Sequence, residues 1–240
     1  MKKVVDKKVF LSIPITLLVV YFCAGIFFNP AYIIYIKPFI IPTFILFVAY
    51  SNSKLLTPNY LLFVILFYIS ETLILFWEDS VTLFRTALIA SFFCYSALIN
   101  LGYNAIKGKN IYSTPKGFSL FILILNGMLL LAILYILTTA INDYLLNIII
   151  VFNTLATVFL GTTAVIYLSK FASTKAYFYF FGVFALIFND IFAAIGTYFI
   201  ENSILNTSDR ILHFGSFILV YLFVLQENKK VDNLEMDYQP

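Results

Sequence analysis

Eight apolar segments account for most of this 240-residue sequence. A helix that crosses the hydrocarbon core of a bilayer needs about 20 mainly apolar residues, and each segment reaches or approaches that length. Main-chain polar groups inside lipid must be satisfied within the segment itself, which favours the α-helix. The pattern therefore predicts an all-α membrane protein with eight transmembrane helices, over residues 9–28, 31–50, 60–77, 82–104, 118–139, 145–168, 176–200 and 211–226.

The composition excludes a water-soluble globular protein. Hydrophobic residues make up 62% of the chain and charged residues only 11%, whereas soluble domains carry about 25% charged residues. Turns are expected at the breaks between the apolar segments, among them residues 29–30, 78–79, 114–115 and 206–209. No polar stretch between the segments is long enough to form a soluble domain. We therefore expect a single transmembrane domain over residues 1–228, followed by a short polar tail over residues 229–240.

The positions of the basic residues predict the topology. An excess of Lys and Arg marks the cytoplasmic side of a membrane. With eight helices and both termini cytoplasmic, 12 of the 15 basic residues lie on that side, namely Lys2, Lys3, Lys7, Lys8, Lys54, Lys107, Lys109, Lys116, Lys170, Lys175, Lys229 and Lys230. The first apolar segment is long enough to span and has no A-x-A-type cleavage site, so we expect a retained helix. The expected location is the bacterial inner membrane.

Three ionisable residues inside apolar segments are the main candidates for a site. They are Lys37, Glu71 and Asp190, and the predicted topology places all three at a similar depth in the outer half of the bilayer. A charged group near the centre of a membrane helix costs about 2.5–3.5 kcal/mol on insertion scales, so it is paired, neutral or exposed to water. We expect Asn189 and Asp190 to face a polar pocket with Glu71 and Lys37 as partners.

Small residues recur at three- and four-residue spacings within segment 176–200, at Gly182, Ala185, Asn189, Ala193 and Gly196. This spacing predicts a face on which a neighbouring helix approaches closely. Asp190 lies just off that face, at the edge of the predicted interface. Two interpretations of Asp190 are open at this point: a functional acid, or a structural acid tied to a hydroxyl or amide on another helix.

The sequence indicates no metal or cofactor. His213 is the single histidine and is expected near a helix end, and no Gly-rich phosphate loop is present. No basic patch suits nucleic acid. Ser96 and Ser216 are further polar candidates within apolar segments, although hydrogen bonds between helices explain them equally well.

Taken in order, the polar landmarks resemble the motifs of the YhhN family, which includes the lysoplasmalogenases. "IKPFIIPTFIL" (36–46) resembles the Lys-Pro element of the family's second helix, and "ILFYISETLILF" (65–76) resembles its third-helix Gly-Asp motif. "FGVFALIFNDIF" (181–192) resembles the seventh-helix stretch, and "FFCYSALIN" (92–100) and "HFGSFILVYL" (213–222) align with two further segments. The resemblance spans the whole chain and implies an eight-helix architecture.

The resemblance implies hydrolysis of the vinyl-ether bond of a lysoplasmalogen, with a lysophospholipid or another single-chain lipid as substrate. Asp190 and Glu71 are then the paired acid and base. Desolvation favours the neutral form of a carboxyl, so Asp190 is the favoured acid, whereas Glu71, nearer Lys37, stays ionised. Lys37 is an alternative ligand for the substrate phosphate, and the other substrate-binding candidates are Asn189, Ser96 and Ser216.

Three positions depart from the family pattern. Glu71 stands where the family usually has Asp, Ser96 where it often has His, and Ser216 where it has His or Gln. Two other hypotheses therefore accompany the hydrolase. One is a non-catalytic lipid-binding or transport protein that uses the same acids, and the other is a family member that retains only the fold.

Overall fold

The computed structural model describes residues 7–27, 33–51, 56–76, 80–107, 117–198 and 203–236. These residues form eight α-helices and contain no β-strand: α1 (Lys7–Phe27), α2 (Ile33–Ser51), α3 (Pro58–Ile74), α4 (Val81–Ile106), α5 (Phe118–Ala140), α6 (Tyr144–Phe171), α7 (Thr174–Tyr198) and α8 (Ser203–Met236). Each predicted apolar segment coincides with one helix. The predicted all-α class is therefore confirmed.

Five of the described helices are long and apolar enough to cross a membrane. They cover Val81–Ile106, Ser119–Ala140, Tyr144–Phe171, Thr174–Gly196 and Thr207–Gln226. Three shorter apolar stretches are also helical, at Leu11–Ala24, Ile36–Ser51 and Pro58–Ile74. A hydrocarbon core about 30 Å thick is crossed by about 20 apolar residues in a helix, a length that the five longer helices reach. The chain is thus a helical integral membrane protein.

Local sequence explains several helix ends. α3 begins with Pro58. Proline lacks a main-chain N–H, and this costs no hydrogen bond in the first turn, where N–H groups have no helical acceptor. Before α6, Asp143 Oδ1 accepts a hydrogen bond from the main-chain N–H of Leu146 at 3.0 Å, which satisfies one unpaired donor of the helix start. Ala172, the residue that follows α6, adopts the left-handed conformation with φ of 36°. The turns predicted at residues 29–30, 78–79 and 114–115 lie outside the described residues.

The last helix differs from the prediction. Hydropathy indicated a span over residues 211–226, but α8 extends from Ser203 to Met236. A turn was expected over residues 206–209, and these residues belong to the first turns of α8. Hydropathy missed both extensions because it reports how apolar a segment is and not whether the segment is helical.

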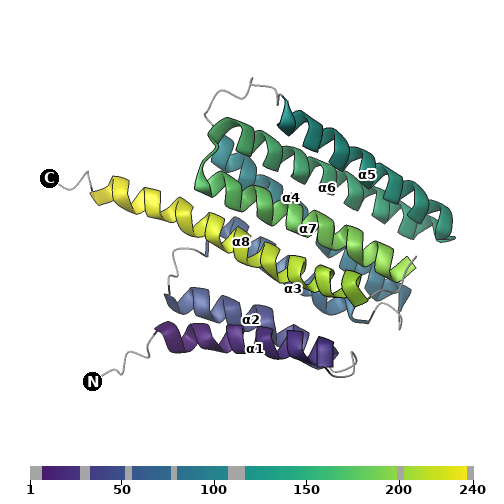
Figure 1. Cartoon of the computed structure of the whole chain (residues 1–240), viewed down its shortest axis with the longest axis horizontal. Coiled ribbons are helices and arrows are strands. Elements are labelled where there is room, and N and C mark those ends of the chain that lie inside the picture. The colour runs from purple at the N-terminus through teal and green to yellow at the C-terminus, as the bar shows by residue number, and fades with distance from the viewer. Residues whose placement is uncertain are drawn as a thin grey trace. The chain divides into compact units, whose positions relative to one another are not determined.

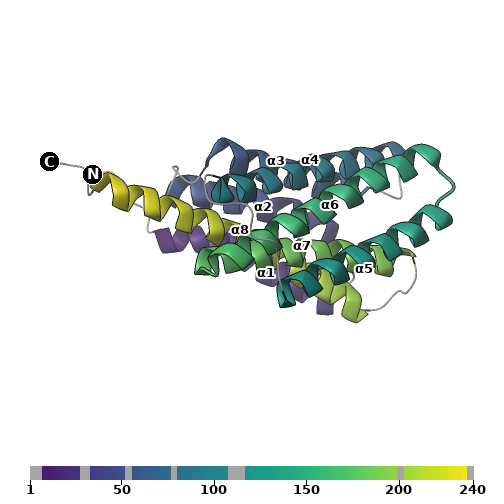
Figure 2. The ribbon, with the colours of Figure 1, turned by 90° about the horizontal axis from the view of Figure 1, so that it is seen from above.

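The chain forms two compact units, Met1–Cys94 and Tyr95–Pro240. In the first unit α1 packs along α2, and α2 contacts α3. In the second unit α5 packs against α6, α6 against α7 and α7 against α8 (Figure 1). Only residues 141–143 join α5 to α6, at one end of the two helices in Figure 2. So short a connection makes the two helices antiparallel neighbours.

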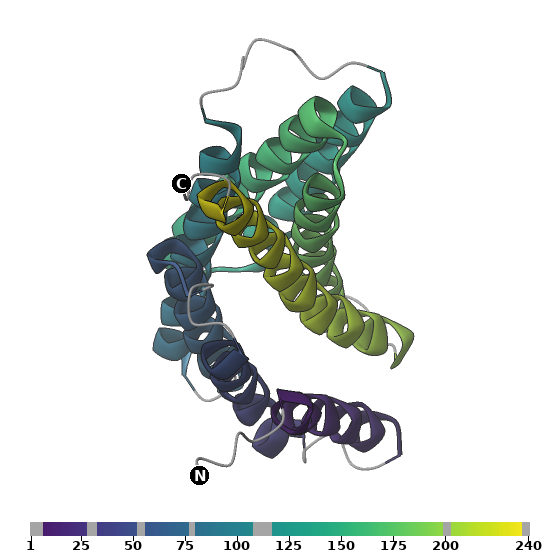
Figure 3. The same cartoon turned by 90° about the vertical axis from the view of Figure 1, so that its left-hand side faces the viewer.

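The small-residue face predicted on α7 packs against α8, and the two helices lie side by side in Figures 1 and 3. A Cβ atom built on Gly182 would lie 3.2 Å from Leu219 Cβ and 3.2 Å from Val220 Cγ2. A side chain at this position would require the neighbouring atoms to move by a few tenths of an ångström, so glycine favours the close approach of the two helices. The predicted close contact is confirmed at Gly182.

Replacing Gly182 by valine is expected to destabilise the α7–α8 contact by about 1–3 kcal/mol, the usual cost of overpacking a filled interface. Thermal unfolding in detergent measures the change. The matched control is Gly127→Val in α5, because nothing lies within 4 Å of a Cβ atom at Gly127. Equal stability of the two variants would contradict the close α7–α8 packing.

Candidate functional site

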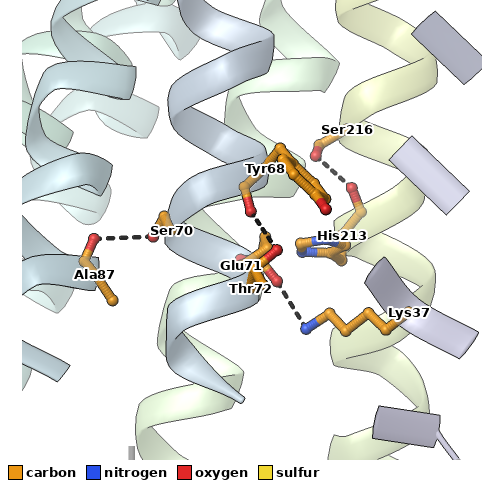
Figure 4. A network of polar contacts seen from close by, with 8 residues as sticks. All are labelled: Lys37, Tyr68, Ser70, Glu71, Thr72, Ala87, His213 and Ser216. Atoms are coloured by element: carbon orange, nitrogen blue, oxygen red, sulfur yellow. Dashed lines mark hydrogen bonds and ion pairs between the residues drawn. The ribbon is translucent and has the colours of Figure 1, made fainter. Parts of the chain in front are cut away.

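An ion pair joins α2 to α3 in the first unit. Lys37 Nζ lies 2.7 Å from Glu71 Oε2 (Figure 4). Both side chains are largely buried, with 19% and 16% of their surfaces exposed. Where little water screens the charges, attraction between them is strong, and each ion offsets the desolvation cost of the other. Lys37 and Glu71, two of the candidates within apolar segments, thus pair with each other, while their expected partnership with Asn189 and Asp190 stays a prediction.

Two prolines follow Lys37 within α2, at Pro38 and Pro42. A proline has no main-chain N–H, so the carbonyl oxygens four residues earlier, at Ile34 and Pro38, lose their ordinary helical donor. Thr43 Oγ1 donates to two carbonyl oxygens of the preceding turn, each at 2.9 Å. Lys37 therefore lies on a helical turn with altered main-chain hydrogen bonding, an arrangement found where a membrane helix lines protein or a cavity.

Neighbouring residues fix α3 on its other side. Ser70 Oγ donates to the carbonyl oxygen of Ala87 in α4 at 2.9 Å (Figure 4). Successive residues of a helix point about 100° apart, so Ser70 bonds to α4 while Glu71 pairs with α2. Within α3, Thr72 Oγ1 donates to the carbonyl oxygen of Tyr68 at 2.8 Å. Ser70 thus joins α3 to α4, and the adjacent Glu71 joins α3 to α2.

The second unit holds Asp190. The Tyr95 hydroxyl donates a hydrogen bond to Asp190 Oδ2, which links α4 to α7. Tyr95 is buried, with 3% of its surface exposed. If Asp190 is a structural acid, it is expected to bond to a hydroxyl or amide on another helix, and the Tyr95 hydroxyl is such a partner. The same hydroxyl could also orient a functional carboxyl group. The hydrogen bond is therefore compatible with both interpretations.

A second tyrosine reinforces the contact between α4 and α7. The Tyr179 hydroxyl donates to the main-chain oxygen of Leu98 at 2.9 Å. The ring of Tyr179 lies directly against Gly102, where a Cβ atom would overlap with it. Two tyrosine hydroxyls thus join these helices, one to a main-chain oxygen and the other to the Asp190 carboxyl.

Asn189 contacts α8 rather than α4. With its amide nitrogen turned toward α8, the side chain donates to Asp209 O at 2.9 Å and to Asp209 Oδ1 at 2.8 Å. This orientation is assigned from the hydrogen bonds that it allows. Asn189 is buried, with 8% of its surface exposed. The adjacent residues Asn189 and Asp190 therefore bind two different helices, which explains why a polar pair occurs in so apolar a segment.

The remaining candidates also lie in the second unit. Ser216 is fully buried, and its hydroxyl donates to the main-chain oxygen of His213 at 2.6 Å within α8. This is a common way for a membrane serine to satisfy its hydroxyl. Ser96 is half-buried and follows Tyr95 in α4. His213 was expected near a helix end, but it is buried well inside α8, so that expectation is wrong.

Two polar residues at the site were not selected from the sequence. Tyr95 is one of 17 tyrosines, and nothing in its spacing distinguishes it from the others. Asp209 was assigned to a turn because polar residues surround it. The motif "FFCYSALIN" (92–100) contains Tyr95 directly before the candidate Ser96. This adjacency was the one feature of the sequence that could have identified Tyr95 as part of the site.

The structure brings the predicted residues together in two groups. Lys37 and Glu71 form an ion pair in the first unit, and Asn189 and Asp190 are held by α8 and α4 in the second unit. A pocket common to both groups stays a prediction. Within the part of the chain that the structure describes, no three His, Cys, Asp or Glu side chains gather in a way that could hold a metal ion.

Comparison of the chain with protein-family models, curated proteins and solved structures found no match. The assignment of this chain to the helical integral membrane proteins therefore rests on its fold.

Proposed function

We propose that this chain is a lysoplasmalogenase-like membrane hydrolase of the YhhN family, which cleaves the vinyl-ether bond of a lysophospholipid. The observation that carries the proposal is the Lys37–Glu71 ion pair. From the resemblance we expect a cation in the second helix and an acid in the third. Lys37 and Glu71 occupy these positions and are in direct contact. Ionisable residues inside membrane segments are functional candidates by default.

The proposed chemistry needs one acid and one base. The acid protonates the alkenyl carbon that bears no oxygen, and the electron pair of the double bond forms the new C–H bond. The resulting oxocarbenium ion takes up water, which the base deprotonates. The hemiacetal then collapses to a fatty aldehyde and the free glycerol hydroxyl. Two carboxyl groups perform the equivalent steps in glycoside hydrolysis, and we assign them here to Asp190 and Glu71.

The roles of the two carboxyl groups follow from their partners. Glu71 is assigned as the base because its carboxyl oxygen lies 2.7 Å from the Lys37 ammonium. Asp190 is then the acid, and its proton is delivered from a side chain that Tyr95 holds in place. The proposal includes that both groups act on one substrate, because the predicted topology places them at a similar depth in the bilayer.

Lys37 is also proposed to contact the phosphate of the substrate. Because its ammonium is paired with Glu71 at 2.7 Å, a phosphate at this site competes with a carboxylate already bound there. The other proposed substrate-binding residues, Asn189, Ser96 and Ser216, supply an amide and two hydroxyls.

The proposed topology has eight spans with both termini in the cytoplasm, in the bacterial inner membrane. It is supported by the positions of the basic residues and by the coincidence of eight apolar segments with eight described helices. No metal, cofactor or nucleic acid enters the proposal.

A non-catalytic lipid-binding or transport protein is the second candidate function. One observation favours it: Asn189 and Asp190 both bind side chains of neighbouring helices, as residues that serve packing do. In this case the acids bind a lipid or a proton, and no covalent bond is broken.

The assay that tests the hydrolase compares two lysophospholipids that differ in one double bond. Purified protein in detergent is expected to release a fatty aldehyde from the vinyl-ether lipid and nothing from its saturated alkyl-ether counterpart, which has no alkene to protonate. Absence of aldehyde with folded protein would contradict the proposal and favour the lipid-binding alternative.

Glu71→Asp is expected to lower the rate of hydrolysis by about a hundredfold, because shortening the side chain moves the reacting oxygen by about 1 Å. The measurement is kcat for aldehyde release, with thermal unfolding as the check on folding. If Glu71 serves packing alone, this variant keeps the activity of the wild type.

A further inference from the structure

We propose that Tyr95 is the positioning residue of Asp190: its hydroxyl fixes the carboxyl group in the orientation and reactivity that the site uses. The catalytic meaning of this inference rests on the proposed function. The coupling between the two side chains can nevertheless be measured without any substrate.

The first argument comes from burial and direction. Tyr95 is 3% exposed, and its hydroxyl donates to Asp190 Oδ2 from a different helix. A tyrosine on a helix points back toward the helix start, so the ring spans the gap between α4 and α7 along a fixed direction. A rigid aromatic side chain with two torsions holds a carboxyl oxygen more firmly than a flexible lysine does.

The second argument comes from the neighbouring residue. Asn189 is bound to Asp209 on α8, so the backbone of α7 is anchored one residue before Asp190. With the backbone anchored on one side and the carboxyl bound on another, the Asp190 side chain has little conformational freedom left. Preorganisation of this kind is what a group that acts in proton transfer requires.

The α4–α7 contact does not depend on Tyr95 alone. Tyr179 is fully buried and donates to the main-chain oxygen of Leu98 at 2.9 Å, with its ring against Gly102. This second bond joins the same two helices without touching a carboxyl. Tyr179 is therefore the matched control that separates packing from positioning.

The experiment compares wild type, Tyr95→Phe and Tyr179→Phe in detergent. Each variant loses one hydroxyl and keeps its ring, and thermal unfolding records any loss of packing. The first readout is covalent labelling of Asp190 by dicyclohexylcarbodiimide, an apolar reagent for membrane carboxyl groups, located by mass spectrometry with Asp190→Asn as the blank. Tyr95→Phe is expected to change the labelling rate by about fivefold, the factor that loss of one ordinary hydrogen bond implies, while Tyr179→Phe leaves it unchanged.

The second readout is hydrolysis of the vinyl-ether lysolipid. Tyr95→Phe is expected to lower kcat by about ten- to a hundredfold with KM little changed, because the misplaced carboxyl affects the chemical step and not binding. Tyr179→Phe is expected to retain the wild-type kcat.

The outcomes separate the two claims. If wild type releases no aldehyde but only Tyr95→Phe alters the labelling of Asp190, the proposed function fails and the positioning role stands. If Tyr95→Phe labels Asp190 at the wild-type rate, or if both variants change it equally, the positioning role is overturned and the Tyr95–Asp190 bond serves packing.

Discussion

Replacing Lys37 by methionine is expected to destabilise the protein by about 3–5 kcal/mol, the usual cost of leaving one partner of a buried ion pair without its counterion. Glu71 lies 2.7 Å from Lys37, and both side chains are largely buried. The single substitution therefore removes the cation that lies against the largely buried Glu71 carboxylate. Chemical unfolding in detergent, monitored by circular dichroism, measures the difference in the free energy of unfolding.

The double variant Lys37→Met with Glu71→Met identifies the cause. It removes both charges and is expected to regain most of the lost stability, because two apolar side chains need no counterion. Lys107→Met serves as the control, since Lys107 is exposed at the end of α4, and its substitution is expected to change stability by less than about 0.5 kcal/mol. A double variant no more stable than the single one would show that the ion pair does not hold α2 to α3.

Replacing Asp190 by asparagine is expected to reduce kcat for vinyl-ether hydrolysis by about 10²–10⁴-fold, the range that general acid–base groups contribute. An amide has nearly the shape of a carboxyl group, and its oxygen still accepts the hydrogen bond from Tyr95. The fold should therefore be retained, while the transferable proton is lost. Initial rates of aldehyde release give the comparison.

The control for Asp190→Asn is Asp143→Asn. Asp143 caps α6 through Leu146, and asparagine is an equally good capping residue, so this variant removes an acid and preserves the local structure. Its activity should match that of wild type. An Asp190→Asn protein that is as active as Asp143→Asn would leave Asp190 a purely structural role.

The sequence predicted the helices well because the hydrocarbon core imposes a length and a composition on each span. The segment over residues 118–139 became α5 (Phe118–Ala140) almost unchanged. α8 was underestimated because its polar ends leave no trace in hydropathy. The limits of an apolar segment show where lipid ends, whereas a helix continues for as long as its hydrogen bonds allow.

The candidate site was predictable where charge was the signal. Lys37 and Glu71 stood out because a charged group inside lipid requires a partner, and their matching predicted depth grouped them with Asp190 without showing which of the three pair. Tyr95 could not be found in this way, because its role depends on which helix lies opposite it. The bond between Asn189 and Asp209 was missed for the same reason, since it requires the geometry between α7 and α8.

Hydrolysis of a vinyl-ether lysolipid by the wild-type protein in heavy water tests the central claim most directly. The aldehyde is reduced to the alcohol at once, so that no later exchange occurs, and mass spectrometry locates the label. Protonation of the alkenyl carbon by an enzymic acid predicts one deuterium on the carbon next to the former aldehyde carbon. Absence of aldehyde, or an aldehyde without deuterium at that carbon, would contradict hydrolysis by acid and base carboxyl groups.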